Sequence, residues 1–141
     1  MRFLLRKYFW HVVVLVLCLL YGLAGSLINV NRLWQYDLGY YDFGIFTTAI
    51  WKAAHFRAPV IDHLIFSNKI IFADHFNPSI FLFSPLFWFT SRNEVLLIVQ
   101  SLLVGLSGYV LFLIGRKVLK SNFLSFSVVI AYFLFDGFPA S

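Results

Sequence analysis

The chain has 141 residues, of which 61% are apolar, 21% are aromatic and only 12% are charged, with a formal net charge of +5. Globular domains average about 25% charged residues, and a chain of this size leaves about a third of its unfolded surface in water. A soluble enzyme, a disordered tail and a disulfide scaffold are therefore excluded, and an integral membrane protein remains. The basic residues lie beside apolar stretches, so they indicate membrane topology and not nucleic-acid binding.

The first apolar stretch covers residues 9–28 and follows three basic residues among the first seven. Twenty residues suffice for a helix to cross about 30 Å of hydrocarbon, so this stretch predicts a transmembrane helix. A cleaved signal peptide is the alternative, because an apolar core at 12–20 and small residues at 24–26 follow the basic start.

Two further spans are predicted at residues 95–115 and 122–138, with Arg116, Lys117 and Lys120 between them. Polar and aromatic residues gather in the long segment 29–94, where aromatic side chains favour the headgroup level of a bilayer. The predicted fold class is an all-α integral membrane protein forming a single membrane domain, 1–141. It has three transmembrane helices, and interfacial juxtamembrane helices lie in the first outer loop.

Residues 78–90 are nearly all apolar, but this segment has 13 residues and Pro85 interrupts it. Basic flanks mark the cytoplasmic side of a membrane protein, which places both the N-terminus and residues 116–120 inside. The first span then leads out of the cell and the second leads back in, so no segment between them can cross the membrane. We therefore expect residues 78–90 to lie in the membrane interface, the loop 29–94 to lie outside, and the protein to be a multi-pass protein of the plasma membrane.

Residues 44–56 predict an interfacial amphipathic helix within this loop. Its apolar face would carry Ile45, Phe46, Ala49, Ile50 and Ala53, and its other faces would carry Thr47, Thr48, Lys52 and His55.

Two local signals predict helix starts near the apolar segment. Asn77 is followed by Pro78, as expected for an N-cap and a first helical residue. Ser91 and Glu94 have the spacing of a capping box before the second span.

Asp42 is the leading candidate for chemistry. A carboxylate held at the membrane surface can act as a general base toward an acceptor hydroxyl. The structural alternative is that Asp42 caps the following helix, and the two roles are compatible. Asp37 is a weaker candidate, because no helix start positions it.

Asp74 and His75 are further candidates for the site, and His75 could bind a phosphate, orient a carboxylate or ligate a metal. The cofactor is unknown. A divalent metal held by Asp62, His63, Asp74 and His75 has ligands of a suitable kind, but no helical His pair or Cys set supports it. The structural alternative for His75 is that it is only a polar residue at headgroup level.

Arg57, Lys69 and Arg92 are candidates for binding the phosphate of a lipid-linked substrate. The alternative is that these cations only solvate the surface or contact lipid headgroups.

Polar and small residues within the spans indicate helix packing. A buried amide needs a hydrogen-bond partner, so Gln100 is expected to face other helices. The pairs Gly22/Ser26 and Ser101/Gly105 have small-xxx-small spacing, which allows close approach of two helices.

Three segments together resemble a known family. The stretch from Asp42 to Trp51 is similar to a D-x-G-x-F…W segment. His75-Phe-Asn-Pro78 with Pro85-Leu86 is similar to H-F-x-P…P-L, and 97–116 to L-x-x-Q…R. In this order, over residues 36–120, they resemble a large family of predicted polytopic membrane proteins of unknown function.

That family in turn resembles the GT-C class of integral-membrane glycosyltransferases. The resemblance implies a polyprenyl-phosphate sugar donor and transfer on the outer side, with Asp42 matching the GT-C acid. GT-C proteins have many spans, so this chain is expected to be the N-terminal part of a longer protein and not to act alone.

Two other functions are kept open: a non-enzymatic small membrane subunit or remnant, and a segment of a transporter. The expected partners are the lipid bilayer, a lipid-linked sugar, and membrane helices of a longer chain or of another subunit. No nucleic-acid partner is expected.

The predicted topology can be tested with single cysteines at Asp42 and Ile80 in a chain whose Cys18 is replaced by alanine. Both positions should react with a membrane-impermeant thiol reagent in intact cells, because both are expected outside. A reporter fused just after Ser91 should also be outside. A cytosolic reporter, with the N-terminus also in the cytosol, would refute this topology.

Overall fold

The computed structural model describes residues 2–37, 40–61, 69–73 and 76–136. It divides into two compact units, residues 1–28 with 98–141, and residues 29–97. The elements are α1 (Arg2–Trp34), α2 (Tyr40–Ala54), β1 (Val60–Ile61), β2 (Lys69–Ile70), η1 (Ile71–Ala73), η2 (Pro78–Trp88), α3 (Glu94–Leu119) and α4 (Asn122–Asp136).

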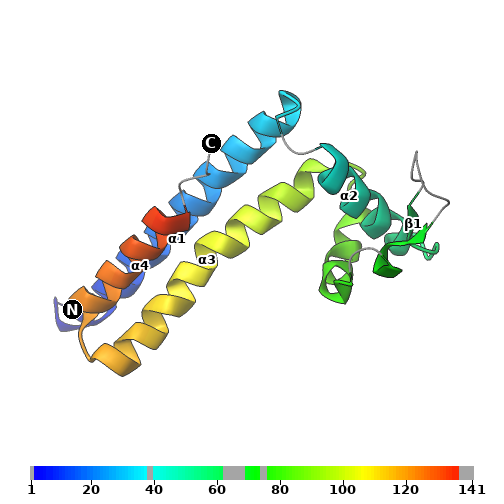
Figure 1. The fold of residues 1–141 in the computed structure, drawn as a ribbon. Coiled ribbons are helices and arrows are strands. Elements are labelled where there is room, and N and C mark those ends of the chain that lie inside the picture. The colour runs from blue at the N-terminus through cyan, green and yellow to red at the C-terminus, as the bar shows by residue number, and fades with distance from the viewer. Residues whose placement is uncertain (1, 38–39, 62–68, 74–75, 137–141) are drawn as a thin grey trace. The chain divides into compact units, whose positions relative to one another are not determined.

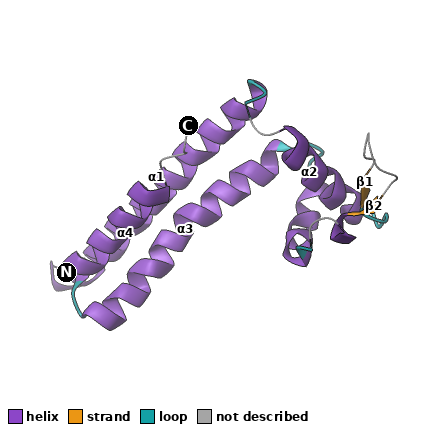
Figure 2. Ribbon diagram, in the orientation of Figure 1, coloured by secondary structure: helices purple, strands orange, loops and turns teal. Residues whose placement is uncertain are grey.

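The described chain is mostly helical, as predicted (Figure 2). It also contains a pair of two-residue antiparallel strands, in which Val60 is opposite Ile70 and Ile61 is opposite Lys69. These strands were not predicted, because a strand of two residues is too short to show an alternating apolar and polar pattern.

In the first unit, α1 and α3 run side by side in opposite directions (Figure 1). The contacts follow this order: Ser26 lies near Ile98, Gly22 near Leu102, and His11 near Tyr109. Helix α1 buries one narrow row with four-residue spacing, consisting of Val14, Cys18, Gly22 and Ser26. Such a row is a single ridge of a helix packed against a neighbour.

Small residues bring these two helices into close contact. A Cβ atom added at Gly22 would lie 3.1 Å from Leu102 Cα, and one at Gly105 would overlap the Cys18 carbonyl and lie 3.0 Å from Gly22 Cα. The Ser26 hydroxyl donates to the Gly22 carbonyl at 2.7 Å and to the Ile98 carbonyl at 3.4 Å. The small-xxx-small prediction is confirmed, since backbone meets backbone at these positions.

Helix α4 reverses direction after Lys120, whose φ of 51° is in the left-handed region, and packs on the same pair. Phe112, Val129 and Phe133 form the shared core with Val14 and Cys18. Tyr21 stacks on Phe133 with ring centroids 4.1 Å apart.

Most of the surface of α1 and α3 is apolar and exposed. The apolar stretches Tyr8–Trp34 and Glu94–Leu119 are 27 and 26 residues long. In the most apolar 18-residue part of each, only 22% and 28% of the residues are buried. Helices that are apolar all round and covered on one stripe need an apolar solvent. Two helices are therefore long and apolar enough to span a bilayer.

The boundaries and the third span differ from the prediction. Helix α1 continues to Trp34 and α3 to Leu119, beyond the expected ends at 28 and 115. Helix α4 has 15 residues, which amounts to about 22 Å and is short of the hydrocarbon thickness. A third crossing remains a prediction.

Gln100, which was predicted to face other helices, is exposed, so the described helices of this chain do not cover it. The buried row of α3 instead contains Ser101, Gly105, Gly108, Phe112 and Gly115. One residue of displacement on a helix turns a side chain by about 100°, so Ser101 is covered and Gln100 is not.

The contact between α1 and α3 predicts that Gly105→Ala destabilises the first unit. The added methyl overlaps the Cys18 carbonyl, and such overpacking costs about 1–3 kcal/mol. The effect is measured as the change in unfolding temperature in detergent, with the reactivity of the buried Cys18 thiol as the signal of unfolding.

Gly25→Ala is the matched control, because its added methyl would be at an ordinary 3.5 Å from Ser101. It should leave the unfolding temperature unchanged or raise it. Equal melting of the two variants would contradict the packing assigned here.

Candidate functional site

Helix α2 is the scaffold of the predicted site, and protein covers its apolar face. Ala49, Ile50 and Ala54 are buried, the first against Ile61 and Ile71 and the others against Phe87. The predicted apolar face is confirmed for Ile45, Phe46, Ala49 and Ile50, whereas the last turn buries Ala54 and not the predicted Ala53. An interfacial helix would bury that face in lipid, whereas here β1, η1 and η2 supply the contacts.

Thr47 was predicted on a face of α2 other than the apolar one, and it is nevertheless buried, with only 3% of it exposed. Its hydroxyl donates to the Phe43 carbonyl at 2.8 Å. A threonine whose hydroxyl bonds to a carbonyl of its own helix can be buried without another partner, so its polarity does not predict exposure.

Asp42 lies in the first turn of α2, which begins at Tyr40. It is therefore not the N-cap residue that the sequence predicted. An acidic residue in the first turn still stabilises the helix through its macrodipole. Its carboxylate is exposed and makes no hydrogen bond or ion pair with any described residue.

Two side-chain bonds hold the C-terminal half of α2. The Trp88 indole donates to the Ala54 carbonyl at 2.7 Å, which ties η2 to α2. Lys52 Nζ donates to the Val60 carbonyl at 2.6 Å, which ties β1 to α2. The helix carrying Asp42 is thereby fixed at its other end.

The two predicted helix starts differ in outcome. Pro78 opens η2 as predicted, but Asn77 makes no capping bond, and its side chain accepts a hydrogen bond from Ser79 instead. Helix α3 begins at Glu94, so the capping box from Ser91 is wrong. The segment 78–90 forms an 11-residue 3₁₀ helix, about 22 Å long, which is too short to cross a bilayer.

The predicted basic residues lie on different elements. Arg57 follows α2 and its guanidinium carbon is 5.8 Å from the centroid of the Trp51 ring. Arg92 is exposed just before α3, and Lys69 begins β2, with its side chain outside the described part. No ion pair joins Asp42 to Arg57 or Arg92, both of which the structure describes.

Several candidates lie outside the described residues: Asp62, His63, Asp74 and His75. Their roles remain predictions. Among residues that the structure describes, no group of three or more His, Cys, Asp or Glu could hold a metal ion.

A recess of about 460 Å³ lies where α1 ends and α3 begins, within the unit 29–97, and Asp42 is not part of it. The Trp34 indole donates to Glu94 Oε1 at 3.2 Å across this recess. An aromatic ring beside a carboxylate, an amide and a guanidinium can stack on and hydrogen-bond a polar ring-shaped ligand. The lining residues are Leu33, Trp34, Tyr36, Ser91, Arg92, Asn93 and Glu94.

The pairing of Trp34 with Glu94 was missed, because the residues are separated by 60 positions. Glu94 was interpreted only as part of a capping box. Asp37, the weaker base candidate, is engaged with Arg32 Nε at 3.1 Å, so its carboxylate is less free than that of Asp42.

The exposed apolar helices, joined in sequence by a folded polar segment, define an integral membrane protein. Residues 32–139 match the family described as Predicted membrane protein (DUF2079), and the chain belongs to this family. The predicted resemblance to an uncharacterised membrane protein family is thereby confirmed. No match was found among curated proteins or among solved structures.

The bond between η2 and α2 predicts that Trp88→Phe loosens the end of α2. The Ala54 carbonyl, on a residue only 3% exposed, loses its donor, at a cost of about 1 kcal/mol. Hydrogen exchange of the amides in residues 51–57 should accelerate about fivefold.

Trp34→Phe removes the other indole bond of this unit and provides the control. Trp34 is 65% exposed, so exchange in residues 51–57 should stay at the wild-type rate. Equal acceleration in both variants would show that the Trp88 bond does not stabilise α2.

Proposed function

We propose that this chain is the N-terminal part of a GT-C-like membrane glycosyltransferase that takes a sugar from a polyprenyl-phosphate carrier on the non-cytoplasmic side. The observation that carries the proposal is Asp42. Its carboxylate is exposed and unpaired among the described residues, and it stands in the first turn of a helix whose later turns are buried against the rest of the segment.

The chemistry needs one base and a good leaving group. The Asp42 carboxylate takes the proton of the acceptor hydroxyl as that oxygen attacks the anomeric carbon. The bond from the anomeric carbon to the carrier phosphate breaks, and the phosphate leaves with the electron pair. Attack opposite the leaving group inverts the configuration of the sugar.

The cations of the segment supply the phosphate contacts in this proposal. Guanidinium groups bind phosphate through paired hydrogen bonds, which suits Arg57 and Arg92, with Lys69 as a further cation. Arg92 lines the recess beside Trp34, which supports a role in holding the donor. Asp74 and His75 remain further site candidates through the family resemblance.

The proposed sidedness follows from the charges. Residues 1–8 and 116–121, which flank the two spans, carry six basic residues and no acid, whereas residues 29–94 carry five of each sign. Cytoplasmic loops of membrane proteins are enriched in Lys and Arg, so 29–94 and Asp42 are assigned to the outer face.

A second candidate is a non-enzymatic membrane subunit, favoured by the exposure of Gln100 on an otherwise apolar span. A polar amide facing lipid costs free energy, and a partner helix would relieve that cost. This role predicts no sugar transfer by the protein.

The distinguishing experiment uses membranes of cells expressing the protein from its genomic reading frame, with a panel of radiolabelled polyprenyl-phosphate sugars. Asp42→Asn should lower transfer by about 10²–10⁴-fold with unchanged protein level, because a general base contributes that factor.

Asp37→Asn is the matched control, since it removes an equal charge five positions away and should retain most activity. Full transfer by Asp42→Asn would refute the role of Asp42. Absence of transfer from every donor by the wild type would favour the subunit.

A further inference from the structure

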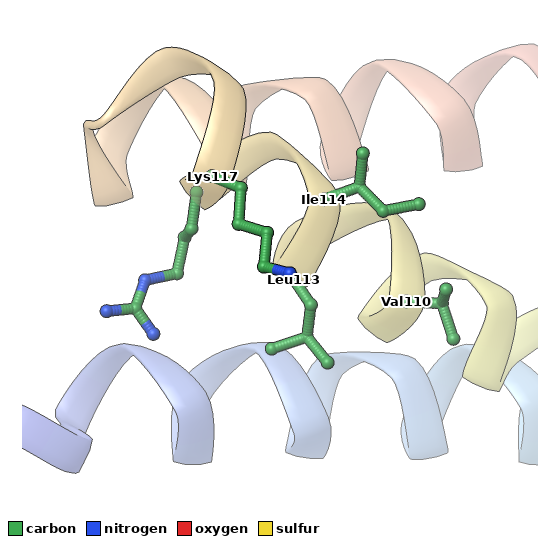
Figure 3. Close-up of a pocket in the computed structure, with 5 residues that line it drawn as sticks. Val110, Leu113, Ile114 and Lys117 are labelled. Carbon is green, nitrogen blue, oxygen red and sulfur yellow. The ribbon is translucent and has the colours of Figure 1, made fainter.

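A second cavity lies along the last turns of α3, in the unit of residues 1–28 and 98–141. It has a volume of about 490 Å³ and is lined by Val110, Leu113, Ile114, Arg116 and Lys117 (Figure 3). Val110 and Ile114 are 55% and 54% exposed, so the aliphatic wall is open to the surroundings. The wall ends in two cations.

The position of these cations along the helix fixes their depth in a bilayer. Helix α3 has 26 residues, which amounts to about 39 Å against a hydrocarbon core of about 30 Å. Its last turn, with Arg116 and Lys117, therefore reaches the headgroup level while Val110, Leu113 and Ile114 remain beside acyl chains.

Arg116 is held in place from α1. Its guanidinium donates a hydrogen bond to His11 Nε2, and its central carbon is 5.8 Å from the centroid of the Phe112 ring. An arginine only donates, so Nε2 accepts and the ring proton is on Nδ1, which donates to the Tyr109 hydroxyl oxygen at 2.9 Å.

This tether uses a minority of the guanidinium donors. Arginine has five N–H groups in a planar fork, so further donors remain for a ligand, and their direction is fixed by the contact with His11. Lys117 is exposed beside it and adds a mobile point charge.

We infer that this cavity binds an anionic phospholipid. The Arg116 fork and Lys117 bind the phosphate, and an acyl chain lies along Val110, Leu113 and Ile114. Charge complementarity selects an anionic headgroup. The open aliphatic wall at acyl-chain depth selects a lipid over free phosphate, which would leave that wall uncovered.

The inference is tested by native mass spectrometry of the full chain in detergent, with phosphatidylglycerol, phosphatidylcholine and inorganic phosphate as separate probes. The wild type should retain phosphatidylglycerol in preference to phosphatidylcholine. Lys117→Gln and Arg116→Gln should each weaken that retention about tenfold, as expected for loss of a charged hydrogen bond.

Lys120→Gln is the matched control. It removes the same charge three residues after Lys117, and the Lys120 side chain does not line the cavity. Lys117→Gln keeps the contact of Arg116 with His11, so its loss of binding is not explained by misfolding of the tether. Val110→Ser should weaken retention of long-chain lipid more than that of a short-chain analogue.

Three results would overturn the inference. An equal loss in Lys120→Gln would show diffuse attraction to surface charge. Equal retention of phosphatidylcholine would show a purely apolar contact. Displacement of phosphatidylglycerol by inorganic phosphate would show a free-phosphate site.

Discussion

The approach of α1 to α3 through small residues is the constraint on which the first unit depends. Gly22 and Gly105 bring two backbones together, and the Ser26 hydroxyl bridges them. In lipid the hydrophobic effect does not drive helices together, so their association depends on van der Waals packing and hydrogen bonds. The core shared with α4, around Phe112 and Val129, is built on this pair.

The segment 29–97 is organised differently, around a conventional apolar core. Helix α2 is fixed by buried side chains on one face and by the bonds from Trp88 and Lys52 near its end. A carboxylate placed in the first turn of such a helix has a defined position without being enclosed. This combination of rigidity and exposure makes Asp42 a better candidate for chemistry than Asp37, which is paired with Arg32.

Local periodicity explains which parts of this structure could be predicted. The apolar face of α2 and the small-residue spacing of α1 and α3 repeat every three to four residues, and both predictions are correct. The burial of Thr47 and the exposure of Gln100 could not be predicted, because polarity alone does not tell whether a side chain bonds within its own helix or faces outward. The hydrogen bonds of Trp34 to Glu94 and of His11 to Arg116 join residues 60 and 105 positions apart, so no local sequence pattern predicts them.

The row of small residues between α1 and α3 also limits how these helices can move. Turning either helix about its axis by one residue, about 100°, would bring a leucine side chain such as Leu23 or Leu106 to a contact that now holds the glycines Gly22 and Gly105. The pair is therefore locked in register. A tilt of this pair in the membrane is therefore expected to move both helices together, as one rod.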